Sequence, residues 1–135
     1  MRTRLAPLRD LQPSQLLISA AKLRRIESKF DTSHAHGVPP VPVRDAGGRP
    51  MLTDGHTRAF ALYRGGADRI RVYDDTDDLD WEAYAICVHW CVEEGIEWVG
   101  DLDGRVVSPE EFERRWLLRC RRMHEELASR RGVGS

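Results

Sequence analysis

Apolar side chains in the C-terminal part of the chain recur with the period of an α-helix. Five of them fall at successive steps of 4, 4, 3 and 4 residues: Phe112, Trp116, Cys120, Met123 and Leu127. This spacing places them on one helix face. The preceding Ser108-Pro109-Glu110-Glu111 combines a capping box with proline at the first helical position. The pattern predicts a long amphipathic helix that begins here and packs its apolar stripe on the rest of the chain.

A second C-terminal segment, residues 81–94, is apolar nearly all round and is followed by Gly95. A helix with this pattern is buried or covered by another element, and we expect the last helix to cover it. Residues 81–130 are therefore predicted to form a helical extension. We place the domain boundary before it, with a core at residues 1–78 and a C-terminal extension at residues 79–135.

The N-terminal part alternates between short apolar runs and helical patterns. An extended segment is expected within residues 5–18, with a turn at Pro13-Ser14. A helix, two strands, a helix and a strand follow, at residues 20–30, 41–44, 50–53, 57–64 and 69–73. This order indicates an α+β fold with a small mixed β-sheet.

Turn and cap residues mark the limits of these elements. Ser19 is a good N-cap for the helix at residues 20–30. The proline in Val41-Pro42-Val43-Arg44 indicates an edge strand or a strand start. The turn Asp45-Ala46-Gly47-Gly48 separates two short strands, which predicts a hairpin.

Composition narrows the class of protein. The 135 residues carry a formal net charge of −1, with 41% hydrophobic and 32% charged residues. This balance is typical of one globular domain. The net charge near zero argues against non-specific electrostatic binding to nucleic acid or an anionic membrane. No apolar run approaches the roughly 20 residues that a membrane span needs. Three cysteines do not make a disulfide framework, so we expect a reducing, cytoplasmic location.

The candidate chemistry is concentrated in Asp54-Gly55-His56-Thr57-Arg58. A short strand leads into a glycine turn and then into a helix, whose first N–H groups and positive dipole end attract phosphate. A carboxylate, an imidazole, a hydroxyl and a guanidinium surround this point. In the alternative interpretation, Asp54 only caps the helix and the other side chains are solvated.

Two polar clusters allow metal binding or a simpler explanation. The aspartates of residues 74–80 are compatible with Mg²⁺, or form a solvated loop in which Asp80 caps the next helix. The His34-x-His36 pair has the spacing of two metal ligands, but it also fits a flexible polar loop.

The C-terminal helices raise two further alternatives. Cys87, Cys91, Cys120 and His124 are spaced so that two helices can present a tetrahedral zinc site. Cys120 also belongs to the apolar stripe, and free cysteine is usually buried. Five arginines of the last helix point to phosphate or an acidic partner, or form its solvated face beside several glutamates: Arg114, Arg115, Arg119, Arg121 and Arg122.

The motif at residues 54–58 resembles the central motif of the ParB N-terminal/sulfiredoxin-like superfamily. In that motif a small residue, a glycine, two variable polar residues and an arginine open a helix. The flanks agree over residues 5–75, just over half of the chain, in Leu11-Gln12-Pro13-Ser14-Gln15, the helix with Lys22, Val41-Pro42-Val43 and residues 69–72. The resemblance implies a ParB/sulfiredoxin-like fold that binds a nucleotide at this helix N-terminus.

The branches of the superfamily differ at individual positions. Sulfiredoxins use ATP, ParB clamps use CTP, and free-serine kinases use ADP or ATP. Arg58 falls on the shared arginine, and His56 falls where sulfiredoxins carry their reactive cysteine. The Asp-Gly-His-x-Arg form is most similar to the free-serine-kinase branch, in which a glutamate stands near the position of Gln15.

Our first hypothesis is a nucleotide-dependent phosphotransferase that uses ATP or ADP with Mg²⁺ and acts on a small hydroxylated metabolite such as an amino acid. The backbone N–H groups of residues 55–57 would bind phosphate, together with Lys22, His56, Thr57 and Arg58. Asp54 is the candidate that orients or deprotonates the acceptor hydroxyl, and the resemblance adds His56 as a second candidate catalytic residue.

The second hypothesis is a nucleotide-sensing or nucleic-acid-associated module without catalysis. Gln15 favours it, because a glutamine cannot act as a general base. The C-terminal helices either cover the pocket or form a homodimer surface through Trp81, Trp90 and Trp116.

Overall fold

The computed structural model describes residues 2–132 as an α+β fold with a four-stranded mixed sheet. The strand order is β1 (Arg4–Pro7), β5 (Arg69–Asp74), β3 (Val41–Ala46) and β4 (Arg49–Leu52). β5 pairs antiparallel with β1 and parallel with β3, and β3 pairs antiparallel with β4. The predicted fold class is confirmed.

The β3–β4 hairpin forms where the sequence predicts it. Ala46 pairs with Arg49 across a two-residue loop, Gly47-Gly48, with φ values of 67° and 88°. Positive φ at both positions is the geometry that matches the strand twist, and glycine adopts it without strain. Pro42 is the second residue of β3. Because β3 lies between β5 and β4, the prediction of a strand start is correct and that of an edge strand is wrong.

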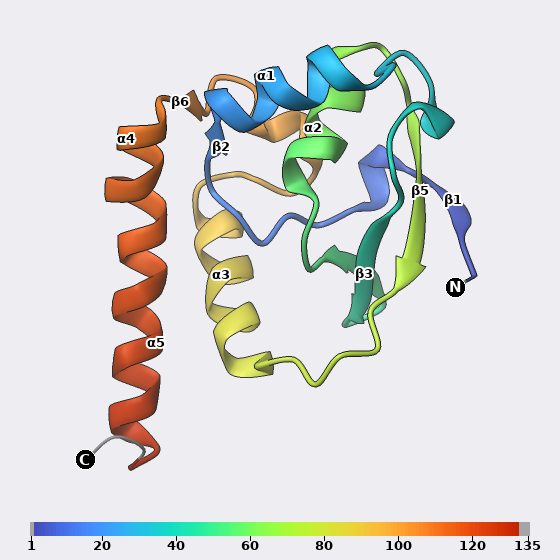
Figure 1. Cartoon of the computed structure of the whole chain (residues 1–135). Helices are drawn as coiled ribbons and strands as arrows, with labels where there is room; N and C mark the ends of the chain where they lie inside the picture. Colours follow the sequence, from blue (N-terminus) through green and yellow to red (C-terminus); the bar gives the residue numbers. More distant parts are fainter. Residues whose placement is uncertain (1, 133–135) are drawn as a thin grey trace.

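Two helices lie beside this sheet, with α1 (Ala20–Lys29) alongside α2 (His56–Arg64) (Figure 1). α2 buries a continuous apolar run, residues 59–62. Ser19 is the N-cap residue of α1, as predicted, although its side chain makes no capping hydrogen bond. Its backbone belongs instead to a strand.

That strand, β2 (Ile18–Ser19), pairs in parallel with β6 (Val106–Val107) in a second, two-stranded sheet. This pairing has no signal in the sequence pattern. It connects the start of α1 directly to the C-terminal helices.

The C-terminal part forms two long helices that run side by side (Figure 1). Its elements are α3 (Trp81–Glu93), the 3-10 turn η3 (Val99–Leu102), and a continuous helix made of α4 (Pro109–Phe112), the π-helical segment η4 (Glu113–Leu117) and α5 (Leu118–Arg130). Both predicted caps are present. The Ser108 hydroxyl accepts the Glu111 N–H at 3.2 Å, and the Asp80 carboxylate accepts the Ala83 N–H at 3.2 Å.

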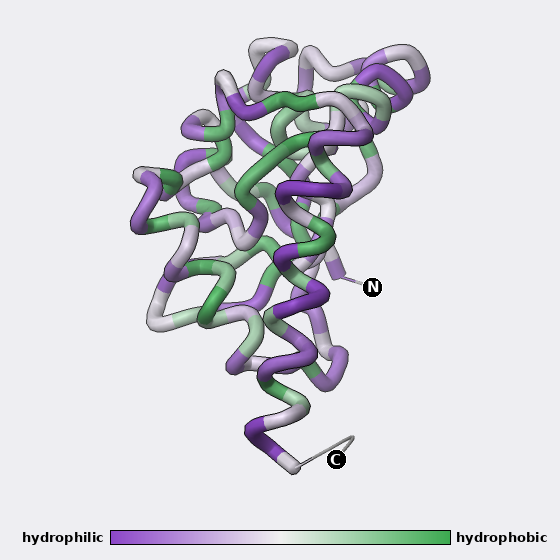
Figure 2. Tube along the Cα trace, turned by 90° about the vertical axis from the view of Figure 1, so that its left-hand side faces the viewer, coloured by the Kyte–Doolittle hydropathy of each residue, from purple (hydrophilic) through white to green (hydrophobic). Residues whose placement is uncertain are grey.

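The apolar stripe of the last helix faces the core as predicted. Phe112, Trp116, Met123 and Leu127 are buried, and Cys120 is half-buried. Figure 2 shows green, hydrophobic positions between purple, hydrophilic ones along this helix.

α3 is only partly covered by its neighbours. It buries only one face, through Ala83, Cys87 and Cys91, while Trp81 is 45% exposed and Val92 is 47% exposed. The Arg44 guanidinium lies 5.4 Å from the Trp81 ring centroid. The last helix thus covers one face of α3, as expected, and leaves Trp81 and Val92 at the surface.

One hydrophobic cluster spans both parts of the chain, from Ala6 to Leu127. The domain boundary at residue 78 stays a prediction. No helix within residues 2–132 combines the length and the apolar character that crossing a membrane requires.

Candidate phosphate-binding site

The turn before α2 has a geometry that requires glycine. Gly55 is the N-cap residue and adopts a left-handed conformation with φ of 77°. A Cβ atom at this position would lie 2.5 Å from Cγ1 of Val41 and 3.0 Å from Nη2 of Arg58. The absence of a side chain therefore lets the backbone pack on β3 and lets the Arg58 guanidinium lie over the turn.

The first turn of α2 presents backbone donors that no described residue accepts. The first backbone hydrogen bond runs from the Ala59 N–H to the Gly55 carbonyl at 3.0 Å. The N–H groups of residues 56–58 precede it and have no acceptor within residues 2–132. The Gly55 N–H, which the sequence analysis assigned to phosphate, instead donates to Oδ1 of Asp54 at 2.8 Å. The available donors are thus shifted by one residue.

A pocket of about 300 Å³ lies at this helix end, and we call it the basic pocket. It is lined by Gln15, Lys22, Arg25, Ile26, Asp54, Gly55, His56, Thr57 and Arg58. The structure thus brings together all six residues that the sequence analysis selected. It adds Arg25, one helical turn after Lys22 on the same face of α1. The three-residue spacing of Lys22 and Arg25 in a predicted helix is a signal from which Arg25 could have been selected.

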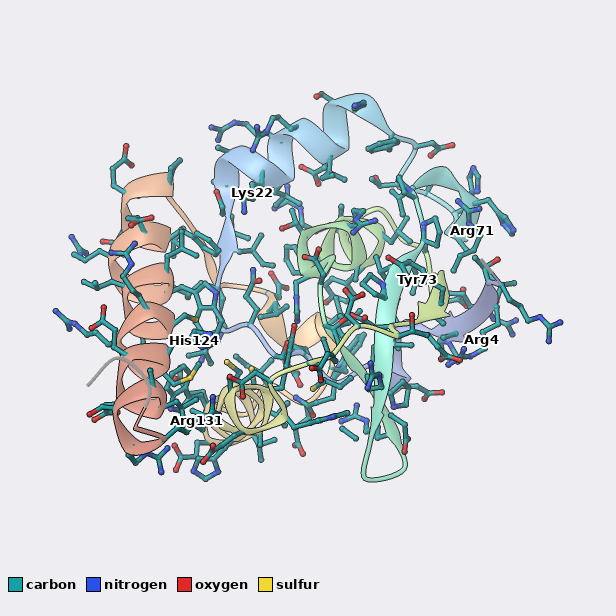
Figure 3. The ribbon with its side chains drawn as sticks, turned by 60° about the horizontal axis from the view of Figure 1, so that its bottom comes forward. Arg4, Lys22, Arg71, Tyr73, His124 and Arg131 are labelled. Atoms are coloured by element: carbon teal, nitrogen blue, oxygen red, sulfur yellow. The ribbon has the colours of Figure 1, made fainter. Side chains whose placement is uncertain are left out.

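The three cations of the basic pocket are not neutralised by the protein. Within the described chain, Lys22, Arg25 and Arg58 lie in no ion pair with a carboxylate. Lys22 contacts the Phe112 ring, with Nζ 5.4 Å from its centroid. Figure 3 shows Lys22 at the beginning of α1. Arg58 donates from Nη1 to the Pro40 carbonyl at 2.8 Å, which fixes its guanidinium beside the free N–H groups.

His56 is buried at the wall of the basic pocket, and its catalytic and phosphate-binding roles stay predictions. Its imidazole is 4% exposed, and Nε2 accepts the Ser14 N–H at 2.9 Å. Burial lowers the pKa of His56 to about 4, against an opposing effect of the nearby Asp54 carboxylate. The ring is therefore neutral near pH 7, with its proton on Nδ1. It offers no positive charge to a phosphate, and it positions the 14–15 segment instead.

Asp54 is exposed and lies at the meeting point of three hollows. One is the basic pocket. The second, which we call the interhelical pocket, has about 250 Å³ and is bounded by apolar side chains of α3 and by the C-terminal helix. The third, the acidic hollow, has about 740 Å³ and is lined by Asp74, Asp75 and Asp77. Among the described residues, no other side chain lines all three.

The interhelical pocket has a polar wall and an apolar wall. Ser14, His56 and Tyr84 contribute polar groups, and Cys87, Trp116 and Met123 contribute apolar surface. His124 lies on the side of α5 that faces the core (Figure 3). Gln15, the residue near the expected glutamate, lines both this pocket and the basic pocket, and its amide donates to the Leu17 carbonyl at 2.9 Å.

The acidic hollow is organised by hydrogen bonds within the protein. Oδ2 of Asp75 accepts the Thr53 hydroxyl at 2.6 Å, and Oδ1 accepts the Asp77 N–H at 2.9 Å. These bonds lower the pKa of Asp75. Asp74 forms an ion pair with Arg4 at 3.0 Å. Within residues 2–132, no three histidine, cysteine or acidic side chains are placed to hold a metal ion.

This result also covers the proposed zinc ligands and the histidine pair. Cys87 lies beside Cys120, whereas Cys91 lies beside the backbone of Gln15. The four predicted ligands therefore do not form one set. His34 contacts Asp31 at 3.2 Å in an exposed loop.

The arginines of the last helix are largely paired along its surface. Arg114 and Arg115 contact Glu111, Arg121 contacts Glu113, and Arg119 lies 3.8 Å from Glu94. Trp90 and Trp116 pack edge to face with their centroids 6.1 Å apart. Trp81 is thus the one exposed side chain of the three tryptophans assigned to a dimer surface, and the dimer stays a prediction.

No protein-family model matches the sequence, and no curated protein matches it. The chain is similar in structure to protein Atu1540 from Agrobacterium tumefaciens, with a TM-score of 0.46 and 17% identity over 72% of this chain and 50% of that one. It is also similar to the C-terminally truncated chromosome-partitioning protein ParB from Caulobacter crescentus complexed with CTP-gamma-S, with a TM-score of 0.46 and 20% identity over 69% of this chain and 54% of that one.

The chain thus spans about half the length of these two proteins. Both similarities concern the fold alone, and the free-serine-kinase branch stays a prediction.

Proposed function

We propose that the basic pocket binds the phosphates of a nucleotide and that the protein transfers a phosphoryl group to a small hydroxylated metabolite. The observation that carries this proposal is that Lys22, Arg25 and Arg58 converge on the N–H groups of residues 56–58, and that within residues 2–132 neither the cations have carboxylate partners nor the N–H groups acceptors. Phosphoryl transfer depends mainly on positioning and on neutralising phosphate charge. These groups supply both.

Asp54 is the proposed catalytic residue. It borders the basic pocket and also the interhelical pocket, so it lies between the nucleotide phosphates and a second compartment. A hydroxyl in that compartment would give its proton to the carboxylate while its oxygen forms the new bond to phosphorus and the nucleotide leaves. With about 250 Å³, the interhelical pocket suits a small acceptor such as an amino acid.

Mg²⁺ is proposed to arrive with the nucleotide. A magnesium ion on a nucleotide usually needs only one or two carboxylates from the protein. Asp54, the single acid among the described residues that line the basic pocket, fits that requirement. When bound, the ion would neutralise phosphate charge.

The second candidate is a nucleotide-binding module without catalysis. Two contacts favour it: Oδ1 of Asp54 already accepts the Gly55 N–H at 2.8 Å, and Gln15 stands where a carboxylate is expected. In this function the same basic pocket binds the nucleotide, and the interhelical pocket holds no acceptor.

Phosphorus NMR separates the two candidates. The protein is incubated with Mg²⁺, one nucleotide (ATP, ADP or CTP) and a set of hydroxylated amino acids and related alcohols. A new phosphate-ester signal that Asp54→Asn reduces by at least about 100-fold supports the phosphotransferase. Asp77→Asn is the matched control, because Asp77 lines only the acidic hollow and should keep the wild-type rate.

Nucleotide binding without any ester supports the non-catalytic module. An Asp54→Asn protein that turns over at the wild-type rate removes Asp54 from the mechanism. Saturating nucleotide should raise the unfolding temperature in either case, because a ligand at 100 times its Kd contributes about 2.7 kcal/mol. No stabilisation by any nucleotide would contradict both candidates.

A further inference from the structure

The three cysteines of the chain differ in what they contact. Cys87 on α3 and Cys120 on α5 lie opposite each other across the interface between the two helices, next to the Trp90–Trp116 contact. Cys91, one turn further along α3, is fully buried and lies near the backbone of Gln15 instead. All three are free thiols. Cys87 and Cys120 therefore form a pair of neighbouring thiols, and Cys91 lies apart from them.

Aromatic contacts fix the two helices at the level of this pair. Trp90 and Trp116 pack edge to face, and the Arg119 guanidinium carbon lies 4.0 Å from the Trp90 ring centroid. Trp90 is one turn beyond Cys87, and Trp116 is one turn before Cys120. The thiols are thus held opposite each other by packing on adjacent turns.

The two thiols have unequal chemistry. Cys120 is half-buried, and the neighbouring Cys87 thiol together with Arg119 lowers its pKa. Cys87 is buried, and the neighbouring Cys120 together with burial raises its pKa. A partly exposed, low-pKa thiol beside a second thiol is the arrangement of redox-sensitive cysteines.

We propose that Cys87 and Cys120 form a reversible oxidation site that links α3 to α5 by a disulfide when the chain meets a peroxide. The Cys120 thiolate attacks one peroxide oxygen, which breaks the O–O bond and leaves a sulfenic acid and, after protonation, one water. The Cys87 sulfur then attacks the Cys120 sulfur, and the expelled hydroxide takes the Cys87 proton as a second water. Two thiols and one hydrogen peroxide thus give one disulfide and two waters.

The disulfide would act on the interhelical pocket. Cys87 lines this pocket together with Trp116 and Met123 of the opposite helix. A disulfide between the two helices would restrict their movement at this wall of the interhelical pocket. The basic pocket at α2 includes neither cysteine. If the interhelical pocket holds the acceptor, as the proposed function states, oxidation changes acceptor turnover and leaves nucleotide affinity unchanged.

Mass spectrometry of the full-length chain tests the oxidation site without reference to activity. The protein is treated with hydrogen peroxide, denatured and alkylated with iodoacetamide. We expect one alkylated thiol and the loss of two hydrogens after oxidation, three alkylated thiols after dithiothreitol, and a raised unfolding temperature only in the oxidised form.

Matched variants assign the bond. Cys91→Ala should oxidise like the wild type and leave no thiol to alkylate, whereas Cys120→Ser should keep both remaining thiols free. Cys87→Ser should stop at the sulfenic acid of Cys120, which dimedone traps. A disulfide that includes Cys91, a product only between two chains, or three free thiols at peroxide levels that oxidise other protein thiols would overturn the proposal.

Discussion

The backbone N–H of Ser14 donates a 2.9 Å hydrogen bond to Nε2 of His56, across 42 residues of sequence. Because this bond needs an unprotonated Nε2, it exists only while the imidazole is neutral. The Ser14 hydroxyl donates in addition to the Leu52 carbonyl at 2.8 Å. The segment that carries Gln15 is thereby attached to the end of β4 and to α2, whose first turn borders the basic pocket.

This bond predicts how stability depends on pH. The pKa of His56 is about 4 in the folded chain and 6.5 as a reference, so the unfolded chain binds the proton first as the pH falls. The contribution of neutral His56 to the free energy of unfolding is complete above pH 6.5. It decreases as the pH falls toward 4, by about 3 kcal/mol in total. Urea unfolding of His56→Gln across this range should show a flatter pH dependence than that of the wild type.

His89→Gln is the control for this measurement. His89 is exposed and contacts Glu93 at 3.1 Å, so its loss should leave the decline in place. An equal pH dependence in the wild type and His56→Gln would contradict the buried, neutral imidazole.

Replacing the cations of the basic pocket should weaken nucleotide binding without unfolding the chain. Arg58→Met removes the guanidinium beside the free N–H groups, and we expect a loss of at least about tenfold in affinity, since hydrogen bonds to charged groups contribute about 1.5–3 kcal/mol. Isothermal titration calorimetry with ATP and Mg²⁺ measures this loss. Circular dichroism checks folding, because Arg58 also bonds to the Pro40 carbonyl.

Arg25 and Arg24 form a matched pair for the same titration. Both lie on α1, but only Arg25 lines the basic pocket. Arg25→Met should lower nucleotide affinity by a few-fold, about 0.5–1 kcal/mol, as expected for an exposed charge near a phosphate, and Arg24→Met should not. Equal effects of the two variants would indicate a diffuse electrostatic contribution instead of a pocket.

Gly55→Ala should destabilise the fold more than an ordinary glycine replacement. The new Cβ would lie 2.5 Å from the Val41 side chain, at a φ of 77°. Gly48→Ala has a similar φ of 88° but meets no atom within 4 Å, so it shows the backbone strain alone, about 1 kcal/mol. Urea unfolding should show a larger loss of stability for Gly55→Ala than for Gly48→Ala. The loss caused by Gly55→Ala should be smaller when it is measured in a Val41→Ala background.

Arg131 controls the acidity of Asp80 at the start of α3. Its guanidinium donates to both carboxylate oxygens of Asp80, at 3.1 Å and 2.9 Å, as well as to Glu82. The Arg131 hydrogen bond, followed by that of the Ala83 N–H, lowers the pKa of Asp80 from 3.8 to about 2. Figure 3 shows Arg131 at the end of the last helix.

Carboxyl carbon NMR should therefore find the pKa of Asp80 raised toward 3.8 in Arg131→Met and unchanged in Arg130→Met, whose guanidinium contacts Glu82 alone at 3.6 Å. In the wild type, any stabilisation from this contact is present above pH 3.8 and is lost as the pH falls toward 2. A wild-type pKa that Arg131→Met does not move would contradict the contact.

Features encoded by neighbouring residues could be predicted from the sequence. The Gly47-Gly48 hairpin, the Ser108 cap and the spacing of the last helix are such features, because each depends on a few residues close in the chain. The turn at Gly55 also depends on residues close in the chain, so the polar groups at the start of α2 could be predicted from the sequence around it.

Features that depend on distant contacts could not be predicted. The pairing of β2 with β6 joins residues 18 and 106, and neither two-residue strand has a pattern of its own. The neutral state of His56 depends on Ser14 and on burial by the fold. The exposure of Trp81 depends on how much of α3 its neighbours cover, which the composition of one helix does not determine.

Nitrogen–proton correlation NMR during a titration with ATP and Mg²⁺ tests the central claim most directly, because it observes the backbone N–H groups of residues 56–58 themselves. We predict saturable shifts of these amides, accompanied by the residues of α1 around Lys22 and Arg25, and loss of the shifts in Arg58→Met. Unmoved amides at residues 56–58, or shifts confined to another surface of the protein, would contradict the assignment of a phosphate-binding site at the start of α2.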